Sequence, residues 1–214
     1  MIITLFDYGA GNLHSLGKAV AAAGVEVRVE TDPAAAVRDT DALVLPGVGA
    51  FAAAAERLAP GREAMRDALA GGLPCLGICL GMQLLFDESE EGPGAGLGLL
   101  AGRVTRLRAR RVPQIGWNAV EDPHDELLAR SRLDVAYYAN SFVCRPVNEG
   151  VVTAWSTHEG DRFPAAVRHG RTVGVQFHPE KSSAPGLAMV RAFVEEVRMA
   201  QGVPAGRAGA EGGR

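Results

Sequence analysis

Cys79 stands at the end of a short apolar run and between two glycines, in the sequence Gly-Ile-Cys-Leu-Gly at residues 77–81. This spacing is typical of a nucleophile elbow, in which the chain turns sharply from a strand into a helix and glycine avoids crowding at the turn. A thiol at a helix N-terminus is favoured as the reactive thiolate. We therefore predict that Cys79 is a nucleophile and that the N–H of Leu80 binds an oxyanion.

Gln83 follows this cysteine by four residues. The spacing puts both side chains on one face of a helix, so the amide would be a polar recognition group beside the nucleophile. The alternative is a buried strand in which the cysteine packs as a small hydrophobic residue, which is the commoner situation for a single cysteine. A second motif is needed to choose between the two interpretations.

That second motif is the sequence Thr-Val-Gly-Val-Gln-Phe-His-Pro-Glu at residues 172–180, an apolar strand that ends in His178 and Glu180. In an extended chain, a spacing of two puts both side chains on one side, where the carboxylate can orient the imidazole. Open α/β sheets place their sites at the carboxyl ends of parallel strands. A cysteine, a base and an orienting carboxylate at such ends predict thiol acyl-transfer chemistry.

Strands and helices that would position these residues alternate along the chain. The predicted strands are residues 2–6, 25–29, 42–45, the run before Cys79, and 173–177; the predicted helices are 13–23, 32–38, 51–58, 62–70 and 186–199. Asn12 is expected to cap the first helix. This alternation is typical of a parallel sheet with right-handed crossovers.

Between residues 97 and 157 the pattern changes to short alternating runs at 102–106, 118–121, 134–138 and 151–156. Such runs predict antiparallel strands. We therefore expect an α/β fold with an open, mostly parallel mixed sheet flanked by helices, and with added antiparallel strands.

A glycine-bearing turn, Pro46-Gly47-Val48-Gly49, ends the third predicted strand, next to the strand that leads to Cys79. Glycines on both sides of Val48 allow the peptide N–H groups to reorient at little steric cost. We predict that this loop supplies an oxyanion donor. The alternative is a plain turn between a strand and a helix.

The composition favours one domain that uses no metal. With 214 residues and a formal net charge of −3, the chain fits a single domain over residues 1–201 and a loose tail at 202–214, and neither nucleic acid nor a membrane is an expected partner. Three cysteines (Cys75, Cys79 and Cys144), without a signal peptide or a long apolar span, indicate a reducing cytoplasm. Cys75 and Cys79 lack the tight Cys-x-x-Cys spacing of a zinc site. Neither a metal nor an organic cofactor is expected.

Over about residues 1–200 the chain resembles the triad-type (class I) glutamine amidotransferases, through residues 77–83 and 176–180 (Gln-Phe-His-Pro-Glu). Within that class it is similar to the glutaminase subunits of imidazole glycerol phosphate synthase, from histidine biosynthesis. The narrower features are Asp-Tyr-Gly-Ala-Gly-Asn-Leu at residues 7–13, the Pro-Gly-Val-Gly turn at 46–49, Gly-Trp-Asn at 116–118 and Lys-Ser-Ser at 181–183.

The resemblance implies hydrolysis of the glutamine side-chain amide, with Cys79 as the nucleophile, His178 as general base and acid, and Glu180 as the residue that orients it. It also implies substrate contacts from Gln83 and from Glu91, whose carboxylate suits the α-ammonium group of glutamine.

The chain departs from the family where His-Ser-Tyr usually follows the aromatic strand, because it has Asn140-Ser141-Phe142 there. Backbone contacts near Ser141 are still expected, but the family's histidine or tyrosine side chain cannot act here.

A partner is also implied by the resemblance. In the family, the face that holds Asn12, Trp117, Tyr137 and Lys181 docks on a cyclase with a (β/α)8 barrel. The resulting heterodimer passes ammonia to the cyclase, which makes imidazole glycerol phosphate and an aminoimidazole carboxamide ribonucleotide.

Two other functions are open at this point. One is the glutaminase of a different ammonia-channelling synthase, such as those of vitamin B6, tryptophan or guanine nucleotide biosynthesis; residues 8–12 and Lys181 favour the histidine pathway over these. The other is a non-catalytic, flavodoxin-like binding module with an accidental triad, which would have no reactive thiol.

Overall fold

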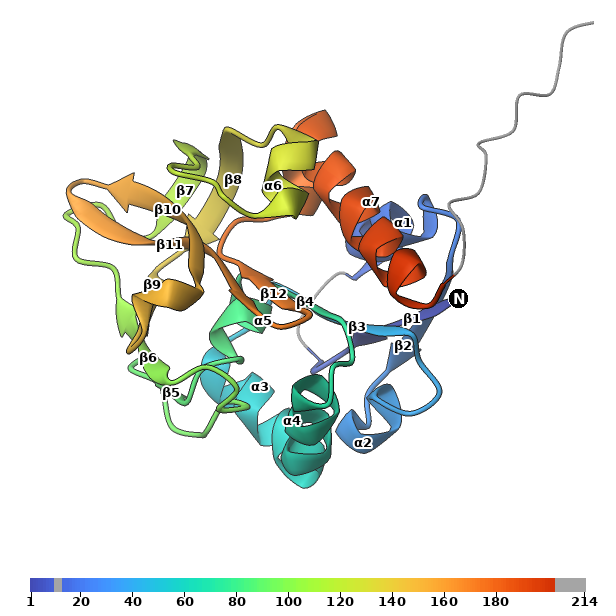
Figure 1. The fold of residues 1–214 in the computed structure, drawn as a ribbon. Coiled ribbons are helices and arrows are strands. Elements are labelled where there is room, and N and C mark those ends of the chain that lie inside the picture. Colours follow the sequence, from blue (N-terminus) through green and yellow to red (C-terminus); the bar gives the residue numbers. More distant parts are fainter. Residues whose placement is uncertain (10–12, 203–214) are drawn as a thin grey trace, which may run out of the picture.

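A seven-stranded sheet runs through the centre of the computed structural model, which describes residues 1–9 and 13–202 (Figure 1). Its strands, in spatial order, are β10 (Val152–His158), β11 (Asp161–His169), β12 (Thr172–Val175), β4 (Cys75–Ile78), β3 (Ala42–Leu45), β1 (Ile2–Phe6) and β2 (Glu26–Glu30). The strands from β12 to β2 pair in parallel, whereas β10 and β11 are antiparallel. The predicted mixed and mostly parallel sheet is therefore confirmed.

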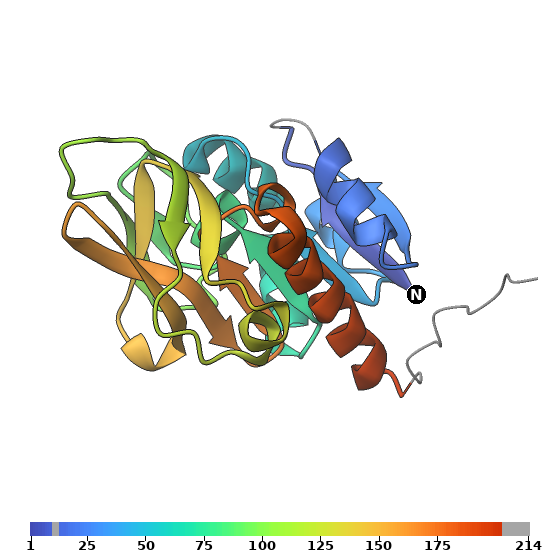
Figure 2. The same ribbon diagram turned by 90° about the horizontal axis from the view of Figure 1, so that it is seen from above.

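Helices cover both faces of this sheet (Figure 1, Figure 2). One face carries α1 (His14–Ala21), α6 (Glu126–Ser131) and α7 (Ser183–Ala200), and the other carries α2 (Pro33–Ala36), α3 (Phe51–Leu58) and α4 (Arg62–Ala70). The single turn α5 (Leu80–Gln83) follows β4, and 3-10 turns lie at Ala59–Gly61, Glu149–Val151 and Pro179–Lys181.

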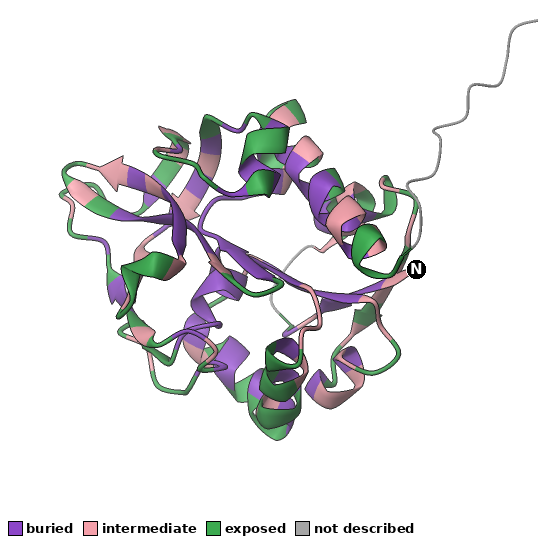
Figure 3. Ribbon diagram, in the orientation of Figure 1, coloured by how far each residue is buried: buried purple, intermediate pink, exposed green. Residues whose placement is uncertain are grey.

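Each face of the sheet has its own apolar core. Leu43 and Leu45 of β3 pack into the core beneath α3 and α4, while Val44 packs into the core beneath α1 and α7. The alternation follows from the two-residue period of a strand. All residues of β3, β4 and β12 are buried, as expected for parallel strands that are covered on both faces (Figure 3). The carboxyl ends of these three strands thus start from a rigid frame.

Two smaller sheets lie beside the central one. The first contains β5 (Glu88–Ser89), β6 (Gly102–Arg106) and β9 (Phe142–Pro146), and the second is the antiparallel pair of β7 (Gln114–Ala119) and β8 (Val135–Asn140). The prediction of antiparallel strands in this region is right in kind. The predicted run at 118–121 is wrong in place, because the strand ends at Ala119 and contains the Gly-Trp-Asn segment.

Three elements between residues 126 and 169 are not indicated by the sequence pattern. Pro146 lies in β9 and Pro164 in β11, and proline within a run argues against a strand. Helix α6 has six residues, too few to show a helical period. Its N-cap is Asp125, whose carboxylate accepts a hydrogen bond from the N–H of Leu127 at 2.8 Å.

The helices near the two ends of the chain differ in length from the predicted ones. The first helix is shorter than the predicted 13–23, and its expected cap, Asn12, lies outside the described residues. The closing helix contains the predicted 186–199 and extends beyond it at both ends. The tail predicted at 202–214 also lies outside the described residues, apart from Gly202.

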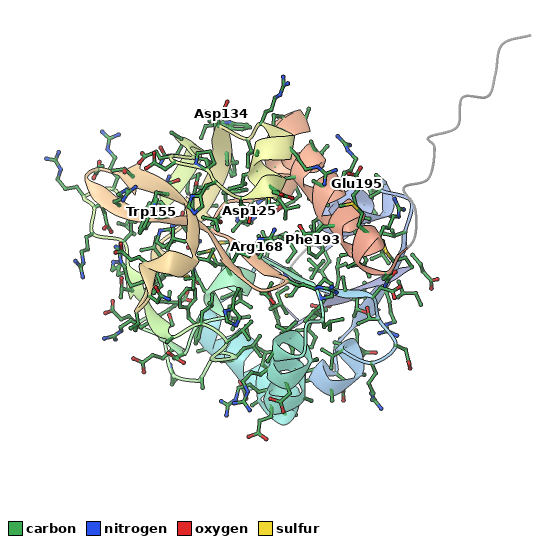
Figure 4. The ribbon with its side chains drawn as sticks, viewed as in Figure 1. Asp125, Asp134, Trp155, Arg168, Phe193 and Glu195 are labelled. Atoms are coloured by element: carbon green, nitrogen blue, oxygen red, sulfur yellow. The ribbon has the colours of Figure 1, made fainter. Side chains whose placement is uncertain are left out.

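An ion-pair cluster joins the antiparallel part of the sheet to two helices (Figure 4). Arg168 of β11 contacts the carboxylate of Asp125, the N-cap of α6, at 2.5 Å, and that of Glu196 on α7 at 2.8 Å. Its side chain is only 24% exposed. Partly buried, multiply bonded pairs of this kind are stronger than exposed ones, so the cluster fixes α6 and α7 against β11.

Candidate active site

The nucleophile elbow is held by contacts that only glycine permits. Cys79 follows β4 with φ 47° and ψ −103°, a backbone conformation that is costly for a side-chain-bearing residue. A methyl group on Gly81 would lie 2.0 Å from the carbonyl oxygen of Leu45, and one on Gly77 would lie 2.8 Å from the backbone of Gly81. The two glycines therefore allow the elbow to pack on the neighbouring strand and on itself. The strained cysteine is 6% exposed.

The helix after Cys79 is shorter than the sequence suggests. α5 is a single turn of four residues, so its dipole is a weak source of thiolate stabilisation. Leu80 occupies its first position, where a helical N–H has no partner within the helix. The sequence predicts that a helix dipole favours the thiolate, but one helical turn is too short for a strong dipole. The N–H of Leu80 does lie next to Cys79, as expected.

His178 lies beside the elbow because β12 and β4 are neighbours in the sheet. The N–H of Cys79 donates to the carbonyl of Val175 at 2.7 Å, which ties the elbow to the strand before His178. Nδ1 of His178 is 2.8 Å from Oε1 of Glu180. Glu180 lies in a 3-10 turn rather than in the extended chain that the spacing predicts, yet its carboxylate still reaches the ring.

The electrostatics of this pair favour a charged imidazole. Burial lowers the pKa of His178, but hydrogen bonds with Cys79 and Glu180 outweigh the burial and raise the pKa to about 9. At neutral pH the ring is therefore an imidazolium, with Glu180 on one nitrogen and the Cys79 sulfur as its other partner. Oε2 of Glu180 is buried and has no hydrogen-bond partner among the described residues.

The glycine turn after β3 touches both reactive residues. A methyl group on Gly47 would lie 2.9 Å from Cε1 of His178 and 3.0 Å from Cβ of Cys79, so the bare backbone of this residue forms one wall of the site. Val48 is partly buried, and Gly49 has a φ of 112°, in the region that favours glycine. Of the three predicted loop residues, Gly47 thus lies against the pair, and Val48 and Gly49 follow it in the loop.

Both ends of this loop are fixed by hydrogen bonds. The hydroxyl of Tyr8, which is 3% exposed, donates to the carbonyl of Pro46. Burial and the neighbouring Cys79 raise the pKa of Tyr8 well above its ordinary value, so the hydroxyl keeps its proton. At the other end, Glu91 accepts a hydrogen bond from the N–H of Phe51 at 2.8 Å, and its side chain is otherwise exposed.

The amide of Gln83 lies in a buried polar row behind the cysteine. Its Nε2 is 3.1 Å from the carbonyl oxygen of Phe142 and 3.5 Å from Oε1 of Gln176, and Nε2 of Gln176 is 3.5 Å from Sγ of Cys79. Asn140 also donates to the carbonyl of Phe142, at 3.1 Å. Gln176 is absent from the sequence prediction, and its only signal is its place two residues before His178.

Ser141 lies on the rim of the site, between β8 and β9. It is partly buried, and its carbonyl accepts a hydrogen bond from the N–H of Leu107 at 2.9 Å. The carbonyl that meets Gln83 belongs to the next residue, Phe142. The expected backbone contacts between glutamine and the chain near Ser141 stay a prediction.

Ser182 is a second residue beside the site that the sequence prediction lacks. Its hydroxyl donates to the carbonyl of His178 at 2.7 Å and accepts from the N–H of Tyr137 at 2.9 Å. The side chain is 1% exposed, so these two bonds have no competition from water. The residue follows Lys181 in the Lys-Ser-Ser segment, and that segment is the only sequence signal for it.

The predicted docking residues gather on the exposed side of β7 and β8, next to the site. Trp117 and Tyr137 are cross-strand partners whose rings meet edge to face with centroids 6.1 Å apart, and Trp117 is 55% exposed. Nζ of Lys181 lies 5.9 Å from the centre of the Tyr137 ring. Ile115, two residues before Trp117, is 68% exposed. We call Ile115, Trp117, Tyr137 and Lys181 the aromatic face. Asn12, which is also predicted to contact the partner, lies outside the described residues.

The other two cysteines are unlike Cys79. Cys75 and Cys144 are fully buried, and burial raises the pKa of each thiol well above its ordinary value. All three cysteines are free. Within residues 1–9 and 13–202 no group of three or more His, Cys, Asp or Glu side chains is arranged to hold a metal ion. No helix in that part of the chain has the length and apolar character needed to span a membrane.

The arrangement combines a strained, partly accessible cysteine, a charged histidine held by a carboxylate, and a glycine loop that can present N–H groups. These are the parts that acyl transfer through a thioester requires. The neighbouring amides are suited to hold a polar acyl donor.

Comparison with known proteins agrees with this chemistry. The family model of class I glutamine amidotransferases matches residues 4–197. The imidazole glycerol phosphate synthase subunit HisH of Symbiobacterium thermophilum is 46% identical over 88% of this chain and 91% of that relative. The HisH subunit of Deinococcus radiodurans is 45% identical over 91% and 94% of the two chains, respectively.

Solved structures share the fold at lower identity. A glutamine amidotransferase superposes with a TM-score of 0.72 at 22% identity, over 92% of this chain and 99% of that one. The glutaminase domain of Trypanosoma brucei CTPS, with bound acivicin, gives a TM-score of 0.66 at 17% identity, over 92% and 93% of the two chains. With the matched motifs and the long alignments to HisH, the chain belongs to the class I glutamine amidotransferases, and within them to the HisH subunits of imidazole glycerol phosphate synthase.

Proposed function

We propose that Cys79, His178 and Glu180 hydrolyse the side-chain amide of glutamine and that the ammonia passes to a partner subunit for imidazole glycerol phosphate synthesis. The observation that carries the proposal is the contact of a charged, carboxylate-bound His178 with the sulfur-bearing residue of the elbow. That contact supplies the thiolate and the proton donor together, which is what cleavage of an amide requires.

In the first half-reaction, the Cys79 thiolate attacks the amide carbonyl carbon and the carbonyl electron pair moves to oxygen. The oxyanion is held by the N–H of Leu80 and by an N–H of the 47–49 loop. His178 gives its proton to the departing nitrogen, the C–N bond breaks, and ammonia leaves a thioester behind. In the second half-reaction, His178 takes a proton from water, the hydroxide attacks the thioester, and glutamate leaves while the thiolate is restored.

Glutamine itself would be held by groups around the elbow. The amide of Gln83 is close enough to act on a substrate at the sulfur, and the exposed carboxylate of Glu91 attracts the α-ammonium group. Backbone groups near Ser141 would contact glutamine from the remaining side of its binding site. Since Glu91 also binds the N–H of Phe51, the substrate's ammonium group would be sensed at the end of the glycine loop.

The aromatic face fits a partner. Exposed Trp117 and Ile115 next to a lysine form the mixture of aromatic, apolar and cationic groups that is enriched in protein interfaces. We propose that this face docks on a cyclase with a (β/α)8 barrel, as a heterodimer in the cytoplasm, and that Asn12 contributes to the contact. A cavity of about 260 Å³ between the glycine loop and Lys181, with Glu180 in its wall, offers ammonia a route from the site toward this side.

We further propose that the partner switches the site on through the glycine loop. Gly49 can present a carbonyl to the oxyanion position in one state and an N–H in the other, because glycine accepts both backbone conformations. Loss of one oxyanion donor typically lowers the rate by about 10² to 10³, so the state of this peptide controls turnover. A difference in binding energy of a few kcal/mol between the two loop states is sufficient.

The test is steady-state glutamate production by the chain alone, by its complex with the cyclase, and by the complex with the cyclase ligand. We expect low turnover alone and the highest turnover with the ligand, and no glutamate from Cys79→Ala. Gly49→Pro should bind the cyclase normally but lose the rise, because proline cannot adopt the φ of 112°. Equal turnover in all three states would leave a constitutive glutaminase, and no turnover by a folded complex would contradict the proposal.

A further inference from the structure

Gln176 connects the recognition amide of Gln83 to the cysteine sulfur through a row of buried hydrogen bonds. Gln176 is fully buried, and Gln83 is 4% exposed. The row runs from the carbonyl of Phe142 to Nε2 of Gln83 at 3.1 Å, from that nitrogen to Oε1 of Gln176 at 3.5 Å, and from Nε2 of Gln176 to Sγ of Cys79 at 3.5 Å. The last distance is normal for a hydrogen bond to sulfur, whose radius is larger than that of oxygen.

The direction of this row is fixed by its first member. A carbonyl oxygen only accepts, so Gln83 must turn its NH₂ group toward Phe142 and, with the same nitrogen, toward Gln176. Gln176 must then present its oxygen to Gln83, which leaves its own NH₂ group facing the sulfur. The opposite orientation of either amide would place two donors, or an oxygen and a thiolate, against each other.

Few other groups stabilise a negative sulfur here. The helix α5 is a single turn, so its dipole contributes little. Among the described residues, the titratable groups that interact with the sulfur are His178, which Glu180 holds, the hydroxyl of Tyr8 and the thiol of Cys144, and the thiol of Cys75 lies at the other end of β4. Burial raises the pKa of the last three well above their ordinary values, so they are neutral and offer no positive charge.

We propose that Gln176 is a catalytic residue whose amide N–H binds the Cys79 thiolate, and that Gln83 is the positioning residue that aims it. The inference rests on the proposed role of Cys79 as the nucleophile. In this arrangement the thiolate accepts two hydrogen bonds, one from the imidazolium of His178 and one from the amide of Gln176. The same N–H receives the sulfur when it leaves the thioester as a thiolate in the second half-reaction.

The experiment measures the second-order rate of Cys79 alkylation by iodoacetamide from pH 5 to pH 10 in the full chain, with the site of reaction mapped by mass spectrometry. In Gln176→Met, which keeps the length of the side chain and removes the donor, the rate at pH 7 should fall about tenfold, as expected for the loss of a hydrogen bond to a charged group. The rate at pH 10 should stay unchanged, so that the half-maximal pH moves up by about one unit.

The matched control is Thr172→Val, on the same strand. Thr172 is also buried and polar, its hydroxyl has no partner among the described residues, and it lies at the far end of β12 from the sulfur. This variant should keep the wild-type profile. A Gln176→Met profile that coincides with wild type, or a rate that falls equally at every pH, would overturn the proposal, because a purely structural role does not move the midpoint.

If Gln176→Met fails to fold, Gln83→Met decides the matter. It removes the group that aims Gln176 and should move the midpoint in the same direction, by less; an unchanged midpoint would overturn the proposal. Alkylation by iodoacetamide needs neither glutamine nor a partner. A chain that shows the predicted profiles but never hydrolyses glutamine would therefore contradict the proposed function and leave the role of Gln176 intact.

Discussion

The N–H of His178 donates to the carbonyl of Tyr137 at 2.8 Å, so the base of the candidate site is hydrogen-bonded to the strand that carries the aromatic face. Ser182 closes a second path between the same two residues, through the N–H of Tyr137 and the carbonyl of His178. We therefore expect any displacement of β8 to move the backbone of His178 with it, through these hydrogen bonds.

Ser182→Ala should remove the path through the hydroxyl and leave the direct hydrogen bond between His178 and Tyr137. It leaves the N–H of Tyr137 without its partner, while the carbonyl of His178 keeps only the N–H of Lys181. We therefore expect a loss of about 1–3 kcal/mol in the free energy of unfolding and about a tenfold fall in kcat with little change in KM. Urea unfolding and glutamate production by the complex measure the two effects. Ser182→Thr should restore both, and Ser183→Ala, at the exposed neighbour, should change neither. Equal effects of the two alanine variants would contradict the role of Ser182.

Only Cys79 should react with an electrophilic glutamine analogue. Cys75 and Cys144 are fully buried, with thiol pKa values raised by that burial, whereas Cys79 is the cysteine in contact with a charged histidine. We expect one label per chain by intact mass, placed on Cys79 by peptide mapping and absent from Cys79→Ala. Label on either of the other cysteines, with Cys79 unmodified, would contradict the mechanism at its first step.

Lys181→Ala should weaken binding of the partner while the site stays intact. The ammonium group lies over the Tyr137 ring on the exposed side, where it is available to a carboxylate of a docked subunit. Burial in an interface strengthens such a pair, so we expect at least a tenfold rise in Kd, measured by titration with the cyclase. Labelling of Cys79 should be unchanged. Arg66→Ala, on the exposed side of α4, is the control; the same Kd for both variants would place Lys181 outside the interface.

The stability of the chain should depend on pH through His178. Its folded-state pKa is about 9, because hydrogen bonds with Cys79 and Glu180 outweigh the opposing effect of burial, whereas an unfolded histidine titrates near 6.5. The folded state therefore keeps a proton that the unfolded state releases. The stabilisation is complete below about pH 6.5 and is lost as the pH rises through about 9.

The measurement is the free energy of unfolding in urea from pH 6 to pH 9.5, for wild type and His178→Asn. The difference between the two proteins isolates this histidine from the other titrating groups, and it should shrink steadily across that range. A difference that does not change with pH would show that His178 is not held charged in the folded chain.

Much of the frame follows from local sequence rules. The apolar runs of β3 and β4 and the glycines around Cys79 are strong signals because buried parallel strands and a strained turn tolerate few alternatives. The length of α5 could not be predicted, since the turn after Gln83 is decided by packing rather than by its own residues. Pro146 and Pro164 argue against two strands that nevertheless form, β9 in a small sheet and β11 in the central sheet.

The missed residues of the site share a different cause. Gln176 and Ser182 each contact a residue about 40 to 100 positions away along the chain, and no spacing rule indicates such partners. Each lies within six residues of His178, so the sequence marks their neighbourhood but not their function. Glu180 shows the opposite case, because its contact with His178 is local and forms although the backbone differs from the predicted extended chain.

The glycine loop is fixed at both ends, by the Tyr8 hydroxyl on the Pro46 carbonyl and by the Glu91 carboxylate on the Phe51 N–H. Between these fixed ends a single peptide group can flip. Opposite changes in ψ of one residue and φ of the next rotate the peptide plane and leave the chain on either side in place. The direction of one N–H beside the sulfur can therefore reverse while β3, α3 and the two cores keep their positions. Such a motion is confined to the few residues between the two hydrogen bonds.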